Sequence, residues 1–208
     1  MKSSALRREN PPNCTVKTTN LVKLDPLATR GKFSSNYKIT IGADFSIKQL
    51  QWDNCTKINL QLWDIAGHER FGYMTRVYYK YATAAAIVFD VSRIATFQSV
   101  HKWLKDVKEK VSQPDGSSIP VIVLANKCDI QGATIPTDTV SQYCKAHGIH
   151  AWFLTSAKEN FNIEEAMNTL VEKAIQIKRQ ESMKSDSIIL REQPKRTNEF
   201  DKKASCCA

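Results

Sequence analysis

The stretch AAAIVF, from Ala84 to Phe89, is apolar at every position. The stretch VIVLA, from Val121 to Ala125, has the same character, and Ala151 to Leu154 (AWFL) is a shorter example. Strands that are apolar throughout are typical of parallel sheets, because helices cover both faces of such a sheet. These runs therefore predict parallel strands in the interior of an α/β domain.

Two further segments alternate between apolar and polar residues. They are Asp44 to Trp52 (DFSIKQLQW) and Lys57 to Asp64 (KINLQLWD), joined through Asp53-Asn54. A period of two indicates strands with one buried face, and a connection this short makes the pair antiparallel. We therefore expect an antiparallel hairpin at the edge of a mostly parallel sheet that has helices on both faces.

Apolar residues also recur at helical spacing in two segments. The second segment follows Asn162, with Glu165 three positions later, which is typical of a helix start. We interpret both stripes as ordinary helix faces that pack on the core, not as cofactor sites. The stripes are Phe97, Val100, Leu104, Val107 and Val111, and Ile163, Ala166, Met167, Leu170, Val171, Ala174 and Ile175.

The composition is that of a folded domain with polar ends. Of the 208 residues 42% are hydrophobic, and no run reaches the roughly 20 apolar residues of a membrane span. Residues 1–10 lack the apolar segment of a secretory signal, so we expect the cytosolic side. Composition predicts three zones, namely a divergent polar leader at 1–30, a compact domain at 31–177 and a flexible basic tail at 178–208.

Charge and cysteine usage exclude several functions. The formal net charge of +9 arises mainly from the two ends, whereas a nucleic-acid surface gathers basic and aromatic residues on one face. Nucleic-acid binding is therefore disfavoured. Cys14, Cys55, Cys128 and Cys144 lack the close spacing of zinc sites, and cytosolic thiols stay reduced, so neither metal knuckles nor disulfides are expected.

Three polar motifs directly follow predicted strands. They are Asp64 to Glu69, Asn126 to Asp129 and Ser156 to Lys158. Ligands of parallel α/β sheets bind at the carboxyl ends of the strands. Each motif alone has a simpler interpretation, because a loop Asp is often a capping residue and an Asp-Gly pair often ends a strand in a turn. Together the three motifs predict one binding site at the carboxyl edge.

The range Asn126 to Asp129 (NKCD) resembles the Asn-Lys-x-Asp motif of small GTPases, and Ser156 to Lys158 (SAK) resembles the second base-binding loop of that family. Guanine presents an N1–H and a 2-amino group beside its O6 acceptor. A selective site therefore needs a fixed carboxylate opposite the two donors. The resemblance implies that Asp129 supplies this carboxylate to GTP or GDP.

The same resemblance assigns roles to the neighbouring residues of both loops. Asn126 would tie the first loop to its neighbours, and the stem of Lys127 would lie along the plane of the base. The amide of Ala157 would donate to O6, with Ser156 and Lys158 bracing the second loop. These roles are expectations of the family pattern.

Two more stretches resemble the family's switches. In Trp63 to Gly67 (WDIAG), Asp64 would hold magnesium through water and the Gly67 amide would contact the γ-phosphate. Thr40, in the stretch YKITIG, matches the first switch, whose hydroxyl joins the magnesium and whose amide meets the γ-phosphate. A lone Thr is common at strand starts, so Thr40 depends on its neighbours for this assignment. The implied cofactor is Mg²⁺ bound together with GTP or GDP.

The resemblance then narrows to Rab proteins. Phe45, Trp63 and Tyr78 match the aromatic triad that Rab effectors contact, while their other role is packing of the hairpin and switch. Ile65, together with Leu124 to Asp129, resembles the Rab branch of lysosomes and lysosome-related organelles. The stretches that carry the resemblance are Ile41 to Phe45, Asn59 to Trp63, Arg70-Phe71, Tyr78 to Ala82 and Ile87 to Val91.

The phosphate-binding motif of the family, Gly-x-x-x-x-Gly-Lys-[Ser/Thr], does not occur in this sequence. The only Gly-Lys pair, Gly31-Lys32, has neither flank of the motif. Similarity to Rab proteins begins near Lys32 and ends near Ile177. We therefore expect the family's first strand, phosphate loop and first helix to be absent or replaced. Cys14 to Leu24 alternates weakly and offers a poor substitute for the strand, and Pro26 prevents a long helix from following. An alternative exon or an incomplete gene model would produce this pattern, and we expect GTP binding to be weak.

Two further positions bear on activity and location. His68 stands where Rabs usually carry the Gln that orients the attacking water, so we expect slow hydrolysis that depends on a partner protein. At the end of the chain, Ser205 to Ala208 (SCCA) does not match a four-residue prenylation box. It resembles the Cys-Cys-x ending of Rabs, which implies geranylgeranyl groups on Cys206 and Cys207.

Two functions therefore remain open. The first is a Rab-type GTP-binding switch in vesicle trafficking. By resemblance, it works with effectors, an exchange factor, a GTPase-activating protein, GDP-dissociation inhibitor and the prenylation machinery. Its location would be the cytoplasmic face of endosomal, lysosomal or lysosome-related membranes, with a cytosolic pool. The second is a nucleotide-free pseudo-GTPase that binds or competes for effectors, and nucleotide content distinguishes the two.

Overall fold

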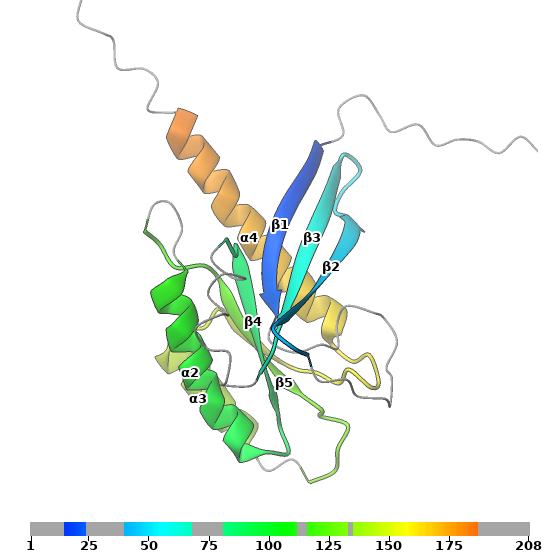
Figure 1. The fold of residues 1–208 in the computed structure, drawn as a ribbon, viewed down its shortest axis with the longest axis vertical. Coiled ribbons are helices and arrows are strands. Elements are labelled where there is room, and N and C mark those ends of the chain that lie inside the picture. The colour runs from blue at the N-terminus through cyan, green and yellow to red at the C-terminus, as the bar shows by residue number, and fades with distance from the viewer. Residues whose placement is uncertain (1–14, 24–39, 68–80, 112–115, 133–134, 187–208) are drawn as a thin grey trace, which may run out of the picture. The chain divides into compact units, whose positions relative to one another are not determined.

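The computed structural model describes residues 15–23, 40–67, 81–111, 116–132 and 135–186. The elements in chain order are β1 (Thr15–Lys23), β2 (Ala43–Gln51), β3 (Thr56–Ile65), β4 (Ala84–Asp90), α2 (Ile94–Lys110), β5 (Val121–Asn126), α3 (Thr137–Ala146), β6 (Ala151–Leu154) and α4 (Ile163–Asp186) (Figure 1). The chain divides into two compact units, Met1–Ile175 and Gln176–Ala208, so α4 begins in the first and ends in the second.

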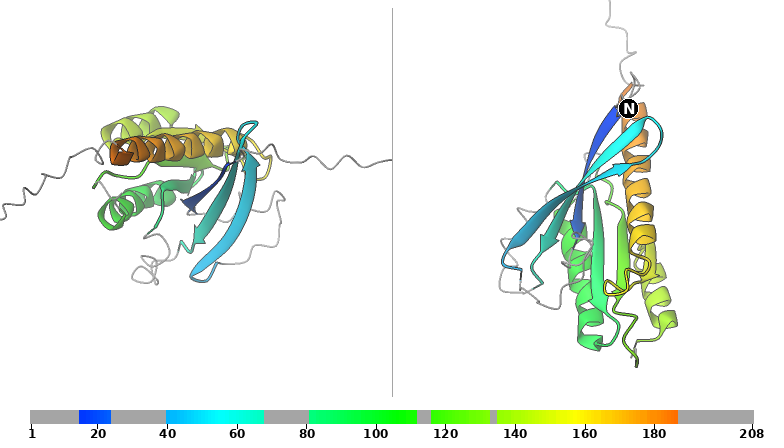
Figure 2. Two further views of the ribbon diagram at one scale, coloured as in Figure 1. Left: turned by 90° about the horizontal axis from the view of Figure 1, so that it is seen from above. Right: turned by 90° about the vertical axis from the view of Figure 1, so that its right-hand side faces the viewer.

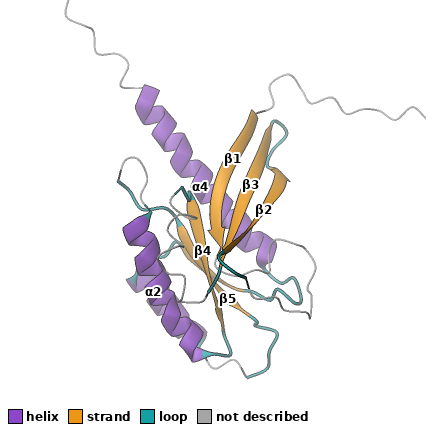
Figure 3. Cartoon of the chain, in the orientation of Figure 1, coloured by secondary structure: helices purple, strands orange, loops and turns teal. Residues whose placement is uncertain are grey.

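The strands form a single six-stranded sheet in the order β2-β3-β1-β4-β5-β6 (Figure 3). All neighbouring strands are parallel except β2 and β3, which pair antiparallel from Ala43 opposite Ile65 to Gln51 opposite Lys57. The mostly parallel sheet with an antiparallel hairpin at its edge is therefore confirmed. Strand β2 lies at one edge and β6 at the other.

Strand β1 lies in the centre of the sheet. It pairs with β3 along its whole length, from Thr15 opposite Thr56 to Lys23 opposite Asp64, and with β4 over Leu21 to Lys23. Thus β1, which lies within the weakly alternating segment noted in the sequence, takes the place of the strand that the family pattern requires. The expected absence of the phosphate loop and first helix within residues 1–30 stays a prediction, because residues 24–30 lie outside the described residues.

Each face of the sheet carries its own hydrophobic core. Strand β4 shows why a parallel strand is apolar throughout, because its successive side chains enter opposite cores. Ala85, Ile87 and Phe89 join the core that contains the buried faces of α2 and α3. Ala84 and Ala86 join the core that contains the first turns of α4. Figure 2 shows α2 and this first part of α4 on opposite sides of the strands.

The two predicted helical stripes are core faces, as expected. In α2, Val100, Leu104 and Val107 are buried, and in α4 Leu170 is fully buried. Burying a Leu side chain contributes about 2 kcal/mol, so each stripe is a substantial part of its helix's attachment. Helix α3 has no counterpart in the sequence-based prediction, because its buried residues are limited to Val140 and Cys144, one turn apart.

Candidate functional site

The candidate site lies where the parallel strands end. Asp64 is at the end of β3, Asp90 is the last residue of β4 and Asn126 is the last residue of β5. The segment Thr155 to Lys158 follows β6 directly. All these strands point the same way, so their carboxyl ends meet at one edge of the sheet.

Asn126 joins the two predicted base-binding loops. Its side chain is buried, and its Oδ1 accepts hydrogen bonds from the Ala157 N–H at 3.2 Å and from the Thr155 Oγ1 at 3.4 Å. The Cys128 N–H also donates to the Thr155 carbonyl at 3.1 Å. Because a buried amide oxygen requires donors, these contacts fix the spacing between the loops. In this arrangement the Ala157 N–H, which the family pattern assigns to O6, already has an acceptor.

Asp129 is oriented by the second loop. The Ser156 Oγ donates to Asp129 Oδ1 at 2.5 Å, and Ser156 itself is buried, with 1% of its surface exposed. The Ser156 Oγ in turn accepts from the Glu159 N–H at 3.1 Å. Asp129 is exposed at the surface. Ser156 thus holds one oxygen of its carboxylate, while the residue stays in contact with solvent.

Lys127 and Lys158 form ion pairs of different character. The Nζ of Lys127 lies 2.8 Å from Asp90 Oδ2, and the Asp90 side chain is only 10% exposed. The Nζ of Lys158 lies 3.2 Å from Glu159 Oε1, with both side chains 59% exposed. Exposed pairs of this kind contribute about 0–1 kcal/mol, so Lys158–Glu159 adds little order. The Lys127–Asp90 pair is anchored in the fold.

Two groups beside this pair have shifted pKa values. Burial raises the pKa of Asp90, but hydrogen bonds from Lys127 and Ser92 and the charge of Lys127 outweigh it, and the pKa lies below its usual range. The carboxylate is therefore ionised at neutral pH. Burial and the charge of Asp129 raise the pKa of the Cys128 thiol, so this cysteine stays protonated at neutral pH.

The two switch residues expected to hold magnesium are in contact. The Thr40 Oγ1 donates to Asp64 Oδ2 at 3.0 Å, and Asp64 is buried, with 4% exposed. The Ala66 N–H donates to the Gly42 carbonyl at 2.9 Å, which ties the same two segments through the backbone. A hydroxyl and a carboxylate are oxygen ligands of the kind that Mg²⁺ prefers, so these residues fit the ion. Gly67 is exposed directly beyond them.

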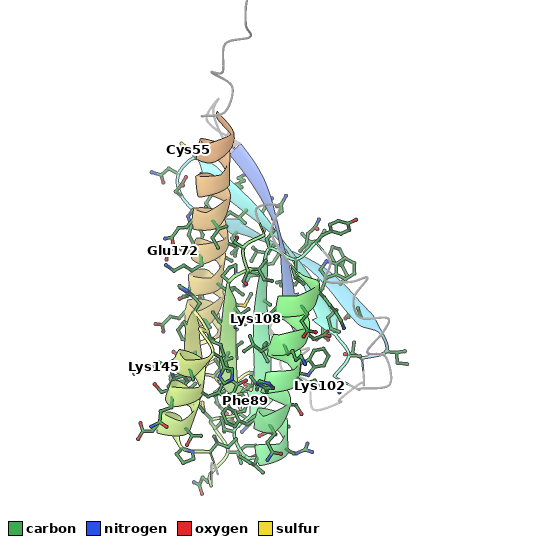
Figure 4. The ribbon with its side chains drawn as sticks, turned by 90° about the vertical axis from the view of Figure 1, so that its left-hand side faces the viewer. Cys55, Phe89, Lys102, Lys108, Lys145 and Glu172 are labelled. Atoms are coloured by element: carbon green, nitrogen blue, oxygen red, sulfur yellow. The ribbon has the colours of Figure 1, made fainter. Side chains whose placement is uncertain are left out.

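Phe45 and Trp63 form an aromatic pair on the edge hairpin. They lie opposite each other in the register of β2 and β3, with ring centroids 4.8 Å apart. Phe45 is 42% exposed, whereas Trp63 packs partly against the core under α2. Figure 4 labels Phe89 of this core. Phe89 packs against Phe97 of α2 with ring centroids 5.0 Å apart. The two predicted triad residues thus combine a packing role with an exposed face.

Several predicted residues lie outside the described residues. They are the hydrolysis residue His68, the third triad residue Tyr78 and the lipidation residues Cys206 and Cys207. Their roles remain sequence-based predictions. Within the part of the chain that the structure describes, no helix combines the length and the apolar character needed to cross a membrane.

Three residues of the site escaped the sequence-based prediction, namely Asp90, Ser92 and Thr155. Asp90 carried a usable signal, because it directly follows the apolar run that ends at Phe89. The same signal identified Asp64 and Asn126. Ser92 and Thr155 carried no signal of their own, since Ser and Thr are common in loops of every kind.

The fold agrees with the comparison against known families. The model of the Ras family matches residues 19–176, and the chain therefore belongs to the Ras family. The match begins inside β1, upstream of the start near Lys32 that the sequence motifs had indicated. β1 occupies a central position in the sheet.

The curated relatives are Rab proteins, as the motifs predicted. Human Rab-32 is 56% identical over 144 residues, which cover 69% of this chain and 64% of that protein. Mouse Rab-32 is 48% identical over 179 residues, covering 84% of this chain and 79% of that protein. Rat Rab-7L1 is 43% identical over 159 residues, which cover 76% of this chain and 78% of that protein. The chain thus spans slightly less than two thirds of the length of human Rab-32.

Proposed function

We propose that this chain is a Rab-type switch that binds GTP and GDP and recruits effectors to a membrane. The observation that carries this proposal is the junction of the Asn126 to Asp129 loop with the Ser156 to Lys158 loop at the carboxyl edge. The junction holds a carboxylate, a backbone N–H and a lysine stem near one another. These are the groups that guanine recognition requires.

In the proposed complex, Asp129 accepts the N1–H and 2-amino hydrogens of guanine, with Ser156 fixing its orientation. The Ala157 N–H donates to O6, which requires that it share or leave its present acceptor on Asn126. Lys127 lies along the base. A selective site of this kind rejects adenine, because adenine presents an acceptor and an amino group in the reverse order.

Magnesium would be held by Thr40 directly and by Asp64 through water, with the Gly67 amide directed to the γ-phosphate. When bound, the ion neutralises charge on the β- and γ-phosphates. The burial of Asp64 at the end of β3 and its hydrogen bond from Thr40 support this proposal. His68 would orient the attacking water, and we expect hydrolysis to GDP and phosphate to be slow without a GTPase-activating protein.

The remaining features support a role at membranes. Phe45, Trp63 and Tyr78 would form the effector surface, and prenylated Cys206 and Cys207 would supply two anchors, which is the number that stable attachment needs. The partners are effectors, an exchange factor, a GTPase-activating protein, GDP-dissociation inhibitor and the prenylation machinery. The site of action would be the cytoplasmic face of endosomal, lysosomal or lysosome-related membranes, with a cytosolic pool.

A second candidate function is an interaction protein that holds no nucleotide. The observation that favours it is the internal pairing of the base site, since the Ala157 N–H bonds Asn126 and Lys127 bonds Asp90. Groups that are already satisfied gain less from a ligand. Such a protein would use the hairpin aromatics to bind or compete for effectors.

The test is a titration of fluorescent GDP, ADP and XDP in the presence of Mg²⁺. Wild type should bind GDP at least about tenfold more tightly than ADP, and Asp129→Asn should lose that preference and gain affinity for XDP. The gain is expected because the Asn amide donates to the 2-oxo group of xanthine. Asp138→Asn, which changes an exposed Asp of α3, serves as the matched control.

The possible results separate the two functions. Equal affinity for GDP and ADP, or unchanged preference in the Asp129 variant, contradicts the proposed base site. If the chain binds none of the three nucleotides but still retains Rab effectors on a column through Phe45, the result supports the second candidate function. Chromatography of nucleotide released from the native protein gives an independent reading of occupancy.

A further inference from the structure

Asp90 lies beside the base-binding loops but belongs to neither motif. It is the last residue of β4 and stands directly opposite Asn126 in the parallel register of β4 and β5. Only 8% of its surface is exposed. A carboxylate this buried requires donors, and its donors show what it does.

The carboxylate is fixed from its own side of the site. Its Oδ1 accepts from the Ser92 N–H at 2.9 Å and from the Ser92 Oγ at 2.6 Å. The backbone N–H of Asp90 donates to the Thr96 Oγ1 at 3.0 Å. Ser92 lies in the β4–α2 connection and Thr96 in the first turn of α2, so the Asp90 carboxylate and backbone each have a hydrogen-bond partner besides Lys127. The second oxygen is directed to the lysine.

Lys127 is the oriented partner of this pair. Its Nζ donates to Asp90 Oδ2 at 2.8 Å, and its side chain is 45% exposed against 10% for Asp90. Its backbone φ of 65° lies in the left-handed region, which costs a non-glycine residue about 1 kcal/mol. A lysine stem is flexible and has many rotamers, so an ion pair with a fixed carboxylate removes most of that freedom.

We propose that Asp90 is a positioning residue for guanine-nucleotide binding that acts through Lys127, holding the lysine stem at the end of β5 where the base is to lie. This inference rests on the proposed function and adds a residue that contacts no part of the nucleotide. Contact with the base thus depends on Lys127, the position of Lys127 depends on Asp90, and the orientation of Asp90 depends on Ser92. Binding affinity is thereby linked to the connection between β4 and α2.

The first test is a double-mutant cycle on fluorescent GDP binding with Mg²⁺. Asp90→Asn retains the shape of the side chain but removes its charge, and it should weaken binding about tenfold, as expected for loss of a charge-assisted hydrogen bond. In a Lys127→Met background, Asp90→Asn should weaken binding no further. Asp90→Glu, which keeps a carboxylate at this position, should bind GDP more tightly than Asp90→Asn when Lys127 is present, and no more tightly in the Lys127→Met background.

A purely structural role of Asp90 predicts a different result. In that case Asp90→Asn would weaken GDP binding equally in the wild-type and the Lys127→Met backgrounds, and that outcome overturns the proposal. Asp106→Asn is the matched control, because it breaks the ion pair of Asp106 with Lys110 on α2, away from the strand ends. It should leave GDP affinity unchanged. Thermal unfolding of every variant shows whether each one folds.

The second test needs no nucleotide. The rate at which an acylating reagent modifies each lysine is measured by mass spectrometry, with Lys145 as an internal reference because it is exposed on α3 (Figure 4). In the wild type Lys127 should react several-fold more slowly than Lys145, and Asp90→Asn should abolish this difference. Equal rates in the wild type overturn the positioning role.

The two tests separate failure of this inference from failure of the proposed function. If the wild type binds no GDP, the proposed function fails, and the acylation rates alone decide whether Asp90 holds Lys127. If the wild type binds GDP but the cycle shows equal losses in both backgrounds, the proposed function stands and the positioning role is wrong.

Discussion

Asp90 shows at the residue scale how the fold keeps a buried charge. Three hydrogen bonds, from Lys127 and from both donors of Ser92, stabilise its ionised form. Burial opposes them, and the net result is a pKa below the ordinary value of 3.8. A group whose pKa is lower in the folded than in the unfolded state stabilises the fold above its unfolded pKa. That stabilisation is lost as the pH falls through the folded pKa.

The first prediction follows from the lowered pKa of Asp90. Asp90→Asn should lower the free energy of unfolding at neutral pH, and the difference from wild type should shrink as the pH falls below about 4. Urea unfolding of both proteins from neutral pH to about pH 3 measures it. A difference that stays constant over this range would show that the charge of Asp90 is not what stabilises the fold.

The second prediction concerns the three cysteines of the described residues. Burial raises the pKa of Cys144 to about 11, and this thiol is 3% exposed. Cys128 is partly buried and also has a raised pKa, while Cys55 is exposed on the β2–β3 connection. Since thiolates are the reactive form, alkylation should proceed in the order Cys55, Cys128, Cys144, with Cys144 more than about tenfold slower than Cys55. Peptide mass spectrometry after brief treatment with iodoacetamide measures it, and rapid labelling of Cys144 in folded protein would contradict its burial.

Individual residues were predictable when a motif of several positions supported them. Asn126, Asp129 and Ser156 were assigned together, and the structure brings them into one hydrogen-bonded junction. Asp90 was overlooked because a single Asp after a strand has many meanings. Its importance depends on Lys127, which comes much later in the chain, and no local pattern reveals such a pairing.

At the scale of elements, strand β1 shows most clearly that pairing with neighbouring strands can determine a strand whose own sequence pattern is weak. Its sequence TVKTTNLVK lacks the continuous apolar character of β4 and β5, yet it lies between β3 and β4. Both of its edges are paired over Leu21 to Lys23. Backbone pairing on two sides thus compensates for weak local preference.

The third prediction tests this central placement. Val22→Pro should destabilise the domain by more than about 2 kcal/mol, because proline cannot donate to the ladder and Val22 has neighbours on both sides, Trp63 and Ala85. Thr15→Pro is the matched control, since proline is tolerated at the first residue of a strand. Chemical denaturation followed by circular dichroism measures both variants, and equal stability of the two would place β1 outside the folded sheet.

Strong patterns predicted their elements well. The hairpin was expected at Asp44 to Trp52 and Lys57 to Asp64, and the strands are Ala43–Gln51 and Thr56–Ile65. Helix α3 could not be predicted because its apolar stripe is short. β1 was expected only as a poor substitute for the family's first strand, because its neighbours decide its place. Tertiary contacts determine both elements, and a local sequence window contains none of them.

For the whole molecule, the distribution of functions follows the geometry of the sheet. The proposed nucleotide site lies at the carboxyl edge of the parallel strands, while the exposed aromatic Phe45 lies on the antiparallel edge hairpin. Trp63 and Asp64 are adjacent in β3, so the aromatic pair and the proposed magnesium residue share one strand.

The fourth prediction concerns attachment of the whole protein to membranes. In eukaryotic cells, Cys206→Ser with Cys207→Ser should move the protein from the membrane fraction to the soluble fraction, whereas Cys55→Ser should not. The reason is that two lipid chains are needed for stable anchoring. Cell fractionation gives the distribution, and the mass of the C-terminal peptide gives the modification. An unmodified C-terminal peptide recovered from membranes would disprove lipid anchoring.

The central place of β1 also has a consequence for biosynthesis. Among the described elements β1 is translated before both strands that pair with it, β3 and β4. Each pairing must close a long loop, and such non-local pairings form slowly. The nascent chain therefore carries β1 without a partner until β3 has emerged, and the second edge of β1 stays unpaired until Asp90 has emerged. We expect chaperones that bind nascent chains to engage this protein during that interval.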